Sequence, residues 1–268
     1  MIFDLGPALL FCPGDRPDRF AKALERADAV ILDLEDAVAP ASKPAARAAL
    51  AEHPLDPARV LVRVNPPSTV DFAADLAALA ATPYRRVMVA KADATLPSVP
   101  GFEVIALCET PAGVLDARDL ARRPEVIALM WGAEDLIASL GGTSSRDRDG
   151  GYRDVARHAR AMVLLAAGAA GIAAIDAVHL AIDDLAGLRS EAEDAVASGF
   201  AATACIHPSH VAVIRDAYRP SAEEVAAARR LLDAAGTGGA VFPHEGRMID
   251  GPVLRHAESV LRRAGSKP

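Results

Sequence analysis

The chain has 268 residues, enough for one large domain or two small ones, and 51% of them are hydrophobic although only 4% are aromatic. Its 29 basic and 36 acidic residues give a formal net charge of −7, which argues against nucleic-acid binding through a broadly basic surface. The three cysteines lie in apolar runs without metal-ligand spacing, so we expect buried thiols in a cytoplasmic protein. We expect no signal peptide and no membrane association, because the most apolar segment, residues 161–175, is too short to span a bilayer.

Eight short apolar runs are predicted to be strands that are buried on both faces. In chain order they are residues 8–12, 29–34, 60–64, 86–90, 104–108, 126–131, 177–181 and 202–206. Most are separated by segments with helical periodicity and start signals, namely a segment beginning at Ser42 and residues 71–81, 111–122, 154–167, 187–198 and 221–235. Residues 93–101 contain two prolines and leave room for only a token helix.

Alternating strands and helices over about 235 residues predict an α/β fold, a (β/α)₈ TIM barrel. A doubly wound open sheet is the competing fold, but no GxGxxG motif follows the first predicted strand. We therefore expect a barrel domain over residues 1–235. Residues 236–268 would form a glycine-rich linker, Gly236-Thr237-Gly238-Gly239, and a lid or subunit-contact segment that ends in an amphipathic helix over about 252–263.

A repeated phrase draws attention to two acidic residues. Glu103-Val104-Ile105-Ala106-Leu107 recurs as Glu125-Val126-Ile127-Ala128-Leu129, and each copy leads into a carboxylate, Glu109 and Asp135. Because parallel strands end at the same edge of a sheet, both acids should lie on the rim where such folds keep their active sites. Either acid alone could be a loop residue or a helix cap. Two carboxylates without a converging Cys or His suit a hard cation such as Mg²⁺, completed by water and substrate oxygens.

Charged residues follow most of the other predicted strands. They include Asp15, Arg16, Glu35, Asp36, Lys91, Asp183, Asp184 and His207, with Arg63 on the third strand itself. Unpaired charges in a cleft are costly, so this crowding favours a functional rim over a merely stable one. His207 and His210 resemble half of a zinc site, but they lack a helical spacing and an obvious third ligand.

Several motifs together resemble the citrate lyase beta-subunit branch of the HpcH/HpaI aldolase superfamily. They lie, in order, at residues 10–20, 30–38, 62–65, 109–110, 131–136, 205–208 and 246–250. Leu32-Asp33-Leu34-Glu35-Asp36 and Gly132-Ala133-Glu134-Asp135-Leu136 carry most of the weight. The chain departs from the pattern at Ala90, where many relatives place proline before the lysine. It is similar to stand-alone beta-subunit-like proteins, malyl-CoA lyases and citramalyl-CoA lyases.

The resemblance implies a homotrimer of barrels, Mg²⁺ held by Glu109 and Asp135, and a CoA-thioester substrate that contacts Arg63 and Glu109. It also implies that the tail motif covers the neighbouring subunit's site. Asp250 in that motif would carry a proton to or from an acetyl-CoA enolate, unless it only caps the final helix. The reaction would be reversible cleavage of a β-hydroxyacyl-CoA into acetyl-CoA and a small 2-oxo acid or acetoacetate.

Secondary roles follow for other rim residues, each with an alternative. Glu35 and Asp36 are expected to hold metal-bound waters, or one of them to cap the next segment. Arg16, with Arg19, would bind CoA phosphates near a helix N-terminus or lie on a solvated face. Arg63 would either hold substrate or pair with Asp33 or Glu35 inside the barrel. A Schiff-base role for Lys91 is disfavoured because the metal site makes it redundant.

Two rival functions remain open at this level. The chain could be the citryl-carrier-protein lyase subunit of a citrate lyase complex, or a non-catalytic scaffold subunit. The acyl group is not determined by the sequence, because malyl, citramalyl and hydroxymethylglutaryl thioesters differ by a methyl or methylene, worth only ~1–3 kcal/mol in a pocket.

Overall fold

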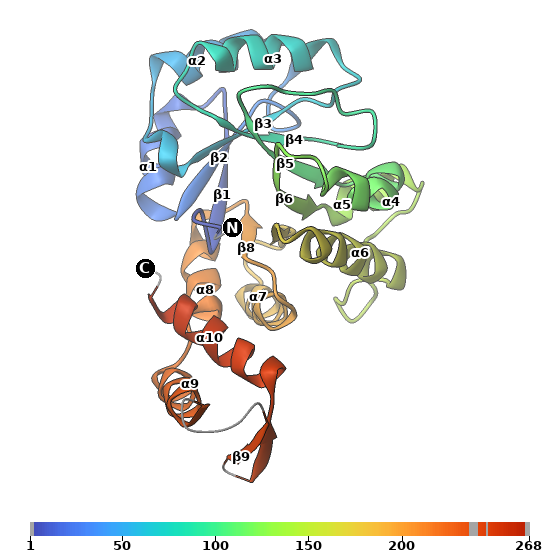
Figure 1. Cartoon of the computed structure of the whole chain (residues 1–268). Coiled ribbons are helices and arrows are strands. Elements are labelled where there is room, and N and C mark those ends of the chain that lie inside the picture. The colour runs from blue at the N-terminus through green and yellow to red at the C-terminus, as the bar shows by residue number, and fades with distance from the viewer. Residues whose placement is uncertain (1–2, 236–240, 245, 266–268) are drawn as a thin grey trace. The chain divides into compact units, whose positions relative to one another are not determined.

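In the computed structural model, which describes residues 3–235, 241–244 and 246–265, eight parallel strands close into a barrel (Figure 1). The strands are β1 Ala8–Pro13, β2 Ala29–Asp33, β3 Val60–Val64, β4 Arg86–Val89, β5 Glu103–Cys108, β6 Val126–Trp131, β7 Ala173–Asp176 and β8 Ala202–Cys205. Each strand pairs with the next in chain order, and β8 closes the barrel against β1, where Leu9 is in register with Ala204. The predicted TIM-barrel fold is confirmed.

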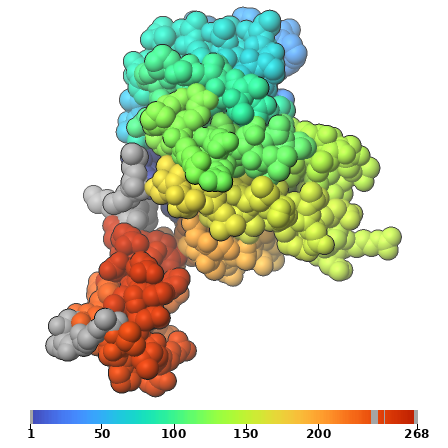
Figure 2. Space-filling model, turned by 45° about the vertical axis from the view of Figure 1, so that its right-hand side comes forward, coloured from blue at the N-terminus to red at the C-terminus, as the bar shows by residue number. Residues whose placement is uncertain are grey.

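Helices cover the outside of this barrel. They are α1 Phe20–Arg26, α2 Lys43–Glu52, α3 Val70–Ala80, α4 Pro111–Leu120, α5 Ala133–Ser139, α6 Asp154–Ala170, α7 Leu185–Ser198 and α8 Pro208–Tyr218, with the short 3-10 turns η1 Pro17–Arg19, η2 Pro40–Ser42 and η3 Pro57–Arg59. Figure 2 shows the cyan, green and yellow parts of the chain lying beside one another in sequence order, as successive βα units require. Residues 90–102, all of them described, contain no helix, so even the token helix expected over residues 93–101 is absent.

The barrel interior is filled by alternate residues of the strands. Leu9, Ile31, Leu61, Met88 and Ile105 belong to one buried cluster, and each is at most 1% exposed. Side chains of a strand alternate between its two faces, so positions two or four residues further along point inward as well. That alternation brings Phe11, Asp33, Arg63 and Glu109 to the mouth of the barrel at the carboxyl ends of the strands.

The seventh strand was placed wrongly by the sequence. The structure has β7 at Ala173–Asp176, and residues 177–181 form a loop on the rim. Helix α6 is rich in alanine and ends at Gly171, which adopts the left-handed conformation (φ 69°), and the strand begins two residues later. Hydropathy alone does not separate such a helix from the strand that follows it. Asp183 and Asp184 therefore precede α7 and do not directly follow a strand, and Asp184 caps α7 by accepting a bond from Gly187 N.

The chain forms two compact units, Met1–Ile214 and Arg215–Pro268. In the second unit, α9 Ala222–Ala235 packs against α10 Gly251–Gly265, and β9 Phe242–His244 pairs antiparallel with β10 Arg247–Ile249. A capping box begins α9, because Ser221 Oγ accepts from Glu224 N (3.1 Å) and Glu224 accepts from Ser221 N (2.7 Å). The proposed boundary at residue 235 remains a prediction, and the predicted linker, residues 236–239, lies outside the described residues. None of the described helices is long and apolar enough to cross a membrane.

Candidate active site

The two copies of the repeated phrase form neighbouring strands. In β5 and β6, Val104 is in register with Val126 and Cys108 with Trp131, with a register shift after the first pair. Glu109 directly follows β5. Asp135 lies in the first turn of α5, four residues after the end of β6, and Gly132 between β6 and α5 is the N-cap. The carboxylate of Glu109 lies on that glycine, since a Cβ at position 132 would be 3.0 Å from Glu109 Oε2. Both acids therefore belong to the same sector of the barrel mouth.

Lys91 lies at the centre of the acidic residues. Its Nζ is 2.5 Å from Glu35 Oε1, 3.3 Å from Asp36 Oδ2 and 3.3 Å from Asp135 Oδ1. It is also 4.0 Å from Glu109 Oε1, the oxygen that accepts a bond from Lys91 N at 3.0 Å. The structure thus brings four predicted rim acids together around one ammonium group. The sequence had identified Lys91 as a rim residue but had not predicted this central place.

The electrostatics of the cluster show a shortage of positive charge. Burial, reinforced by the negative charge of Asp135, raises the pKa of Glu109 to about 8. Burial also raises the pKa of Glu35, against the opposing effect of Arg63 and Lys91. Burial alone would lower the pKa of Lys91, but its bond to Glu35 and the neighbouring acids outweigh burial and raise it. A divalent cation placed here would relieve this imbalance, so the residues fit Mg²⁺.

Arg63 is held firmly by acids inside the barrel. Its Nε and Nη2 donate to the two carboxylate oxygens of Asp33 at 2.7 and 2.6 Å, and its Nη1 is 3.0 Å from Glu35 Oε2. The guanidinium carbon lies 4.9 Å from the centre of the Phe11 ring. The ion pair that the sequence left open as an alternative is therefore present. Three of the five N–H groups of Arg63 bond Asp33 or Glu35, and the other two bond neither of these acids.

Asp33 was missed as a candidate site residue, although its position carried a signal. It continues the inward alternation of Ile31, and an acid at an inward strand position needs a cation opposite it. Asp33 also organises the following turn, because its carboxylate accepts from Glu35 N (2.9 Å) and Ala37 N (3.2 Å). It fixes both Arg63 and the backbone that carries Glu35.

The turn that carries Glu35 is also held from behind by a buried lysine. Lys43 is 7% exposed, and its Nζ donates to Leu34 O (3.0 Å), Glu35 O (3.3 Å) and the side-chain oxygen of Asn65. Asn65 in turn donates to Leu34 O at 2.9 Å and to Asp75 at 2.7 Å. Glu35 (3% exposed) is therefore rigidly placed, whereas the side chain of Asp36 is 62% exposed.

Other predicted residues lie apart from these contacts. Arg16 is exposed and pairs with Asp18 through two bonds of 3.0 and 2.9 Å. His207 is half-buried and bonds Ser209 Oγ at 2.7 Å at the start of α8. Among the described residues, no group of three or more His, Cys, Asp or Glu side chains has the geometry of a metal site. A site of two carboxylates, completed by other oxygens, does not need such a group.

Asp250 belongs to the Arg215–Pro268 unit. It lies immediately before α10, where its carboxylate accepts from Val253 N at 3.4 Å and its carbonyl oxygen accepts from Leu254 N at 3.2 Å. The capping geometry that the sequence offered as an alternative is thus present, although capping leaves a second carboxylate oxygen available. A catalytic role for Asp250 remains a prediction.

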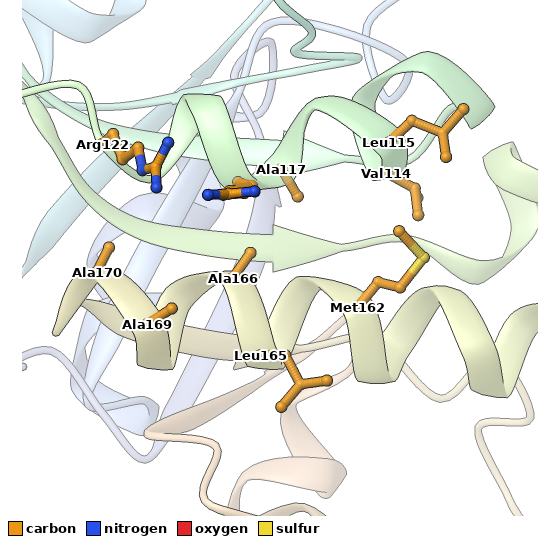
Figure 3. Close-up of a pocket in the computed structure, with 10 residues that line it drawn as sticks. Val114, Leu115, Ala117, Arg122, Met162, Leu165, Ala166, Ala169 and Ala170 are labelled. Atoms are coloured by element: carbon orange, nitrogen blue, oxygen red, sulfur yellow. The ribbon is translucent and has the colours of Figure 1, made fainter.

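A groove of about 290 Å³ lies on the outer wall of the barrel, away from these acids (Figure 3). It runs between α4 and α6 and is lined by Val114, Leu115, Ala117, Arg118, Arg122, Met162, Leu165, Ala166, Ala169 and Ala170. Its lining contains no carboxylate, hydroxyl, thiol or imidazole group, so it lacks the groups that a metal or acid–base chemistry would need. The barrel mouth remains the candidate site.

The chain is similar to several known proteins. The family model for HpcH/HpaI aldolase/citrate lyase matches residues 8–96 and 97–208, which contain the whole acid cluster. A citrate lyase subunit beta-like protein of Mycobacterium tuberculosis is 57% identical over 97% of this chain and 96% of its own length. A (3S)-malyl-CoA thioesterase of Cereibacter sphaeroides is 31% identical over 96% of this chain and 94% of its own. The mitochondrial citramalyl-CoA lyase of Rattus norvegicus is 28% identical, over 97% and 86%.

The fold is also similar to that of a solved relative. The crystal structure of the protein CitE from Mycobacterium tuberculosis, in complex with magnesium, acetoacetate and coenzyme A, superposes with a TM-score of 0.93 at 57% identity. The match covers 97% of this chain and 98% of that one. The chain belongs to the HpcH/HpaI aldolase/citrate lyase family of carbon–carbon lyases.

Proposed function

We propose that this protein cleaves and forms a carbon–carbon bond in a β-hydroxyacyl-CoA thioester with the help of Mg²⁺. The observation that carries the proposal is the buried Glu109, which shares a cation-poor cluster with Asp135 at the mouth of the barrel. Support comes from relatives whose names include a malyl-CoA thioesterase and a citramalyl-CoA lyase. The acetoacetate and coenzyme A bound in the similar structure fit the same class of substrate.

Glu109 and Asp135 would hold the metal ion. Both are carboxylates, the ligands that Mg²⁺ prefers, and Gly132 lets Glu109 lie close to the α5 N-terminus that carries Asp135. When bound, Mg²⁺ would act as a Lewis acid that lowers the cost of negative charge on the substrate hydroxyl oxygen. Glu35 and Asp36 would orient waters around it, because Glu35 is fixed by its turn and Asp36 reaches solvent.

Arg63 would bind the acidic or thioester group of the substrate. Its two bonds to Asp33 fix the plane of the guanidinium, so its remaining N–H groups are oriented before substrate arrives. During cleavage the hydroxyl loses its proton, the Cα–Cβ bond breaks, and the bonding electrons move into the thioester enolate. Arg63 would stabilise the charge that collects on the thioester oxygen.

Asp250 would then give a proton to that enolate, yielding acetyl-CoA beside a 2-oxo acid or acetoacetate. We propose that it acts on the site of another copy in a homotrimer. Glu109→Ala and Asp250→Ala should each be inactive, and co-expression of the two should restore part of the activity, because some mixed oligomers would pair an intact acid cluster with an intact Asp250. Mixed oligomers verified by native mass spectrometry that show no recovery would contradict catalysis between copies.

The decisive assay uses the purified protein alone with Mg²⁺ and malyl-, citramalyl- and hydroxymethylglutaryl-CoA. We expect turnover of at least one thioester with release of acetyl-CoA and the matching oxo acid. Release of free CoA without carbon–carbon cleavage would instead indicate a thioesterase, as in the Cereibacter relative. A protein that works only with partner subunits would be a citrate lyase component, and a protein inactive under all conditions would be a scaffold.

A further inference from the structure

Lys91 has both its backbone and its side chain committed to the acid cluster. Its φ is +50°, in the left-handed region that non-glycine residues rarely adopt. The flanking residues fix this conformation, because Ala90 N donates to Val64 O (3.3 Å) and Ala92 N donates to Leu107 O (3.0 Å). An unfavourable backbone conformation that the surroundings enforce marks a position with a functional demand.

This backbone conformation lets Lys91 contact the acids both through its backbone N–H and through its side-chain ammonium. Lys91 N donates to Glu109 Oε1 at 3.0 Å, and Lys91 Nζ lies 3.3 Å from Asp135 Oδ1. The same ammonium is closer still to Glu35, at 2.5 Å. The ammonium therefore lies beside both proposed metal ligands. If it moves away from those two ligands, it can remain paired with a second pair of acids, Glu35 and Asp36.

The cluster has too few cations for its acids. Five carboxylates, those of Asp33, Glu35, Asp36, Glu109 and Asp135, share the charges of Arg63 and Lys91. Arg63 is bound to Asp33 and Glu35, whereas Lys91 is the cation that lies within ion-pair distance of Glu109 and Asp135. A dication bound by these two acids would repel an ammonium a few ångströms away.

We propose that Lys91 is a resident counter-cation that a divalent metal displaces from Glu109 and Asp135. The ammonium then stays on Glu35 and Asp36. This inference rests on the proposed function, because it requires those two acids to bind the metal. In this arrangement Lys91 keeps the acids together before the metal arrives and weakens metal binding once it has arrived. Substrate carboxylate would restore negative charge, so metal and substrate would bind more tightly together than separately.

The test measures metal binding without catalysis, by titrating Mn²⁺ into the protein and detecting free Mn²⁺ by electron paramagnetic resonance. Lys91→Met keeps the length of the side chain but removes the charge, and it should bind Mn²⁺ about tenfold or more tightly than the wild type. Lys91→Arg keeps the charge and should not gain affinity. Lys22→Met removes one charge from an exposed position of α1 and should match the wild type.

Equal or weaker Mn²⁺ binding by folded Lys91→Met, with a wild type that binds, would overturn this inference and leave the proposed metal site standing. If neither protein binds Mn²⁺, both the inference and the proposed metal site fail. Binding by Lys91→Met alone would also overturn displacement, because the metal would then be unable to displace the lysine of the wild type.

A second measurement, made on the wild type alone, tests the proposal even if Lys91→Met does not fold. Lysines are labelled by reductive methylation with and without Mg²⁺, and the modified peptides are quantified by mass spectrometry. Displacement predicts faster labelling of Lys91 when Mg²⁺ is present and an unchanged rate at Lys22. An unchanged rate at Lys91, at Mg²⁺ concentrations that saturate the site, would overturn the proposal.

Discussion

Two networks of charged side chains lie on the barrel, and they differ in how their buried acids are satisfied. On the outside, where β6, β7, α6 and α7 meet, Arg160 binds Asp176 through two bonds of 3.0 and 2.8 Å and Asp194 through one of 2.6 Å. Trp131 completes the set by donating to Asp176 at 2.5 Å. At the mouth, five carboxylates share two cations and the pKa of Glu109 is raised to about 8. Both networks hold more acids than cations. In the outer one Asp194 is 63% exposed to water and the buried Asp176 accepts bonds from both Arg160 and Trp131, whereas at the mouth Glu109 is buried and its pKa stays raised.

The difference indicates what each network does. The outer one joins strands to a helix and satisfies its acids with nearby donors, so its contribution is to stability. The one at the mouth keeps acids that the protein does not neutralise, which costs stability and is retained where an additional cation binds. Substitutions in the two networks should therefore affect different measurements.

The largest effect on activity is expected from Glu109→Ala. Loss of a metal ligand should lower turnover by at least three orders of magnitude, about 4 kcal/mol of barrier. The free energy of unfolding of the metal-free variant should fall far less than the activity does, because the substitution removes a buried acid whose pKa is raised. Steady-state kinetics at saturating Mg²⁺ test this, and a variant that keeps more than a tenth of the wild-type rate would show that the metal assignment is wrong.

Arg160→Met should have the opposite profile. It leaves Asp176 buried without its cation, which costs about 3 kcal/mol, and that loss corresponds to a fall in Tm of roughly 6–12 °C for a domain of this size. We expect kcat per folded molecule to be unchanged. Calorimetry combined with active-site titration measures both quantities, and a specific loss of kcat would mean that the outer network also serves the site.

Arg63→Lys probes a residue that could belong to either kind of network. Lysine can pair with Asp33 but cannot reproduce the planar fork, so kcat/KM should fall about a hundredfold while Tm changes by only a few degrees. If Tm falls sharply and the kinetics per folded molecule stay unchanged, Arg63 is a structural ion pair like Arg160.

Much of the fold and part of the site were predictable from the sequence, for physical reasons. Strands buried on both faces form continuous apolar runs, so seven of eight were recognised, and the repeated phrase correctly identified the adjacent β5 and β6. β7 was missed because Ala173–Asp176 has the same composition as the end of α6. The order of strands on a closed barrel predicts which residues share the rim, and so the acids were found together.

The contacts between rim residues were not predictable in the same way. Lys91 is central because of a left-handed turn that the sequence does not announce, since no glycine or asparagine stands at that position. Asp33 and Lys43 act through side-chain bonds whose directions depend on packing in three dimensions. The position of a residue in a strand indicates at which end of the barrel its side chain lies. Only the structure shows which other side chain it contacts there.

The last prediction distinguishes the two networks by how protein stability depends on pH. The pKa of Glu109 is about 8 in the folded protein and near 4.5 ordinarily, so between these values the folded state holds a proton that the unfolded chain releases. The stabilising contribution of that proton is fully present below about pH 4.5 and is lost as pH rises through about 8. Glu109→Gln does not titrate, and its amide oxygen can still accept the bond from Lys91 N. Without metal, the Tm of the variant should match the wild type near pH 5 and exceed it by roughly 10 °C or more near pH 9. Saturating Mg²⁺ should reduce that gap by stabilising only the wild type. Thermal melts across this range measure the difference, and a gap that does not change with pH would mean that Glu109 is not the acid whose charge the fold leaves uncompensated.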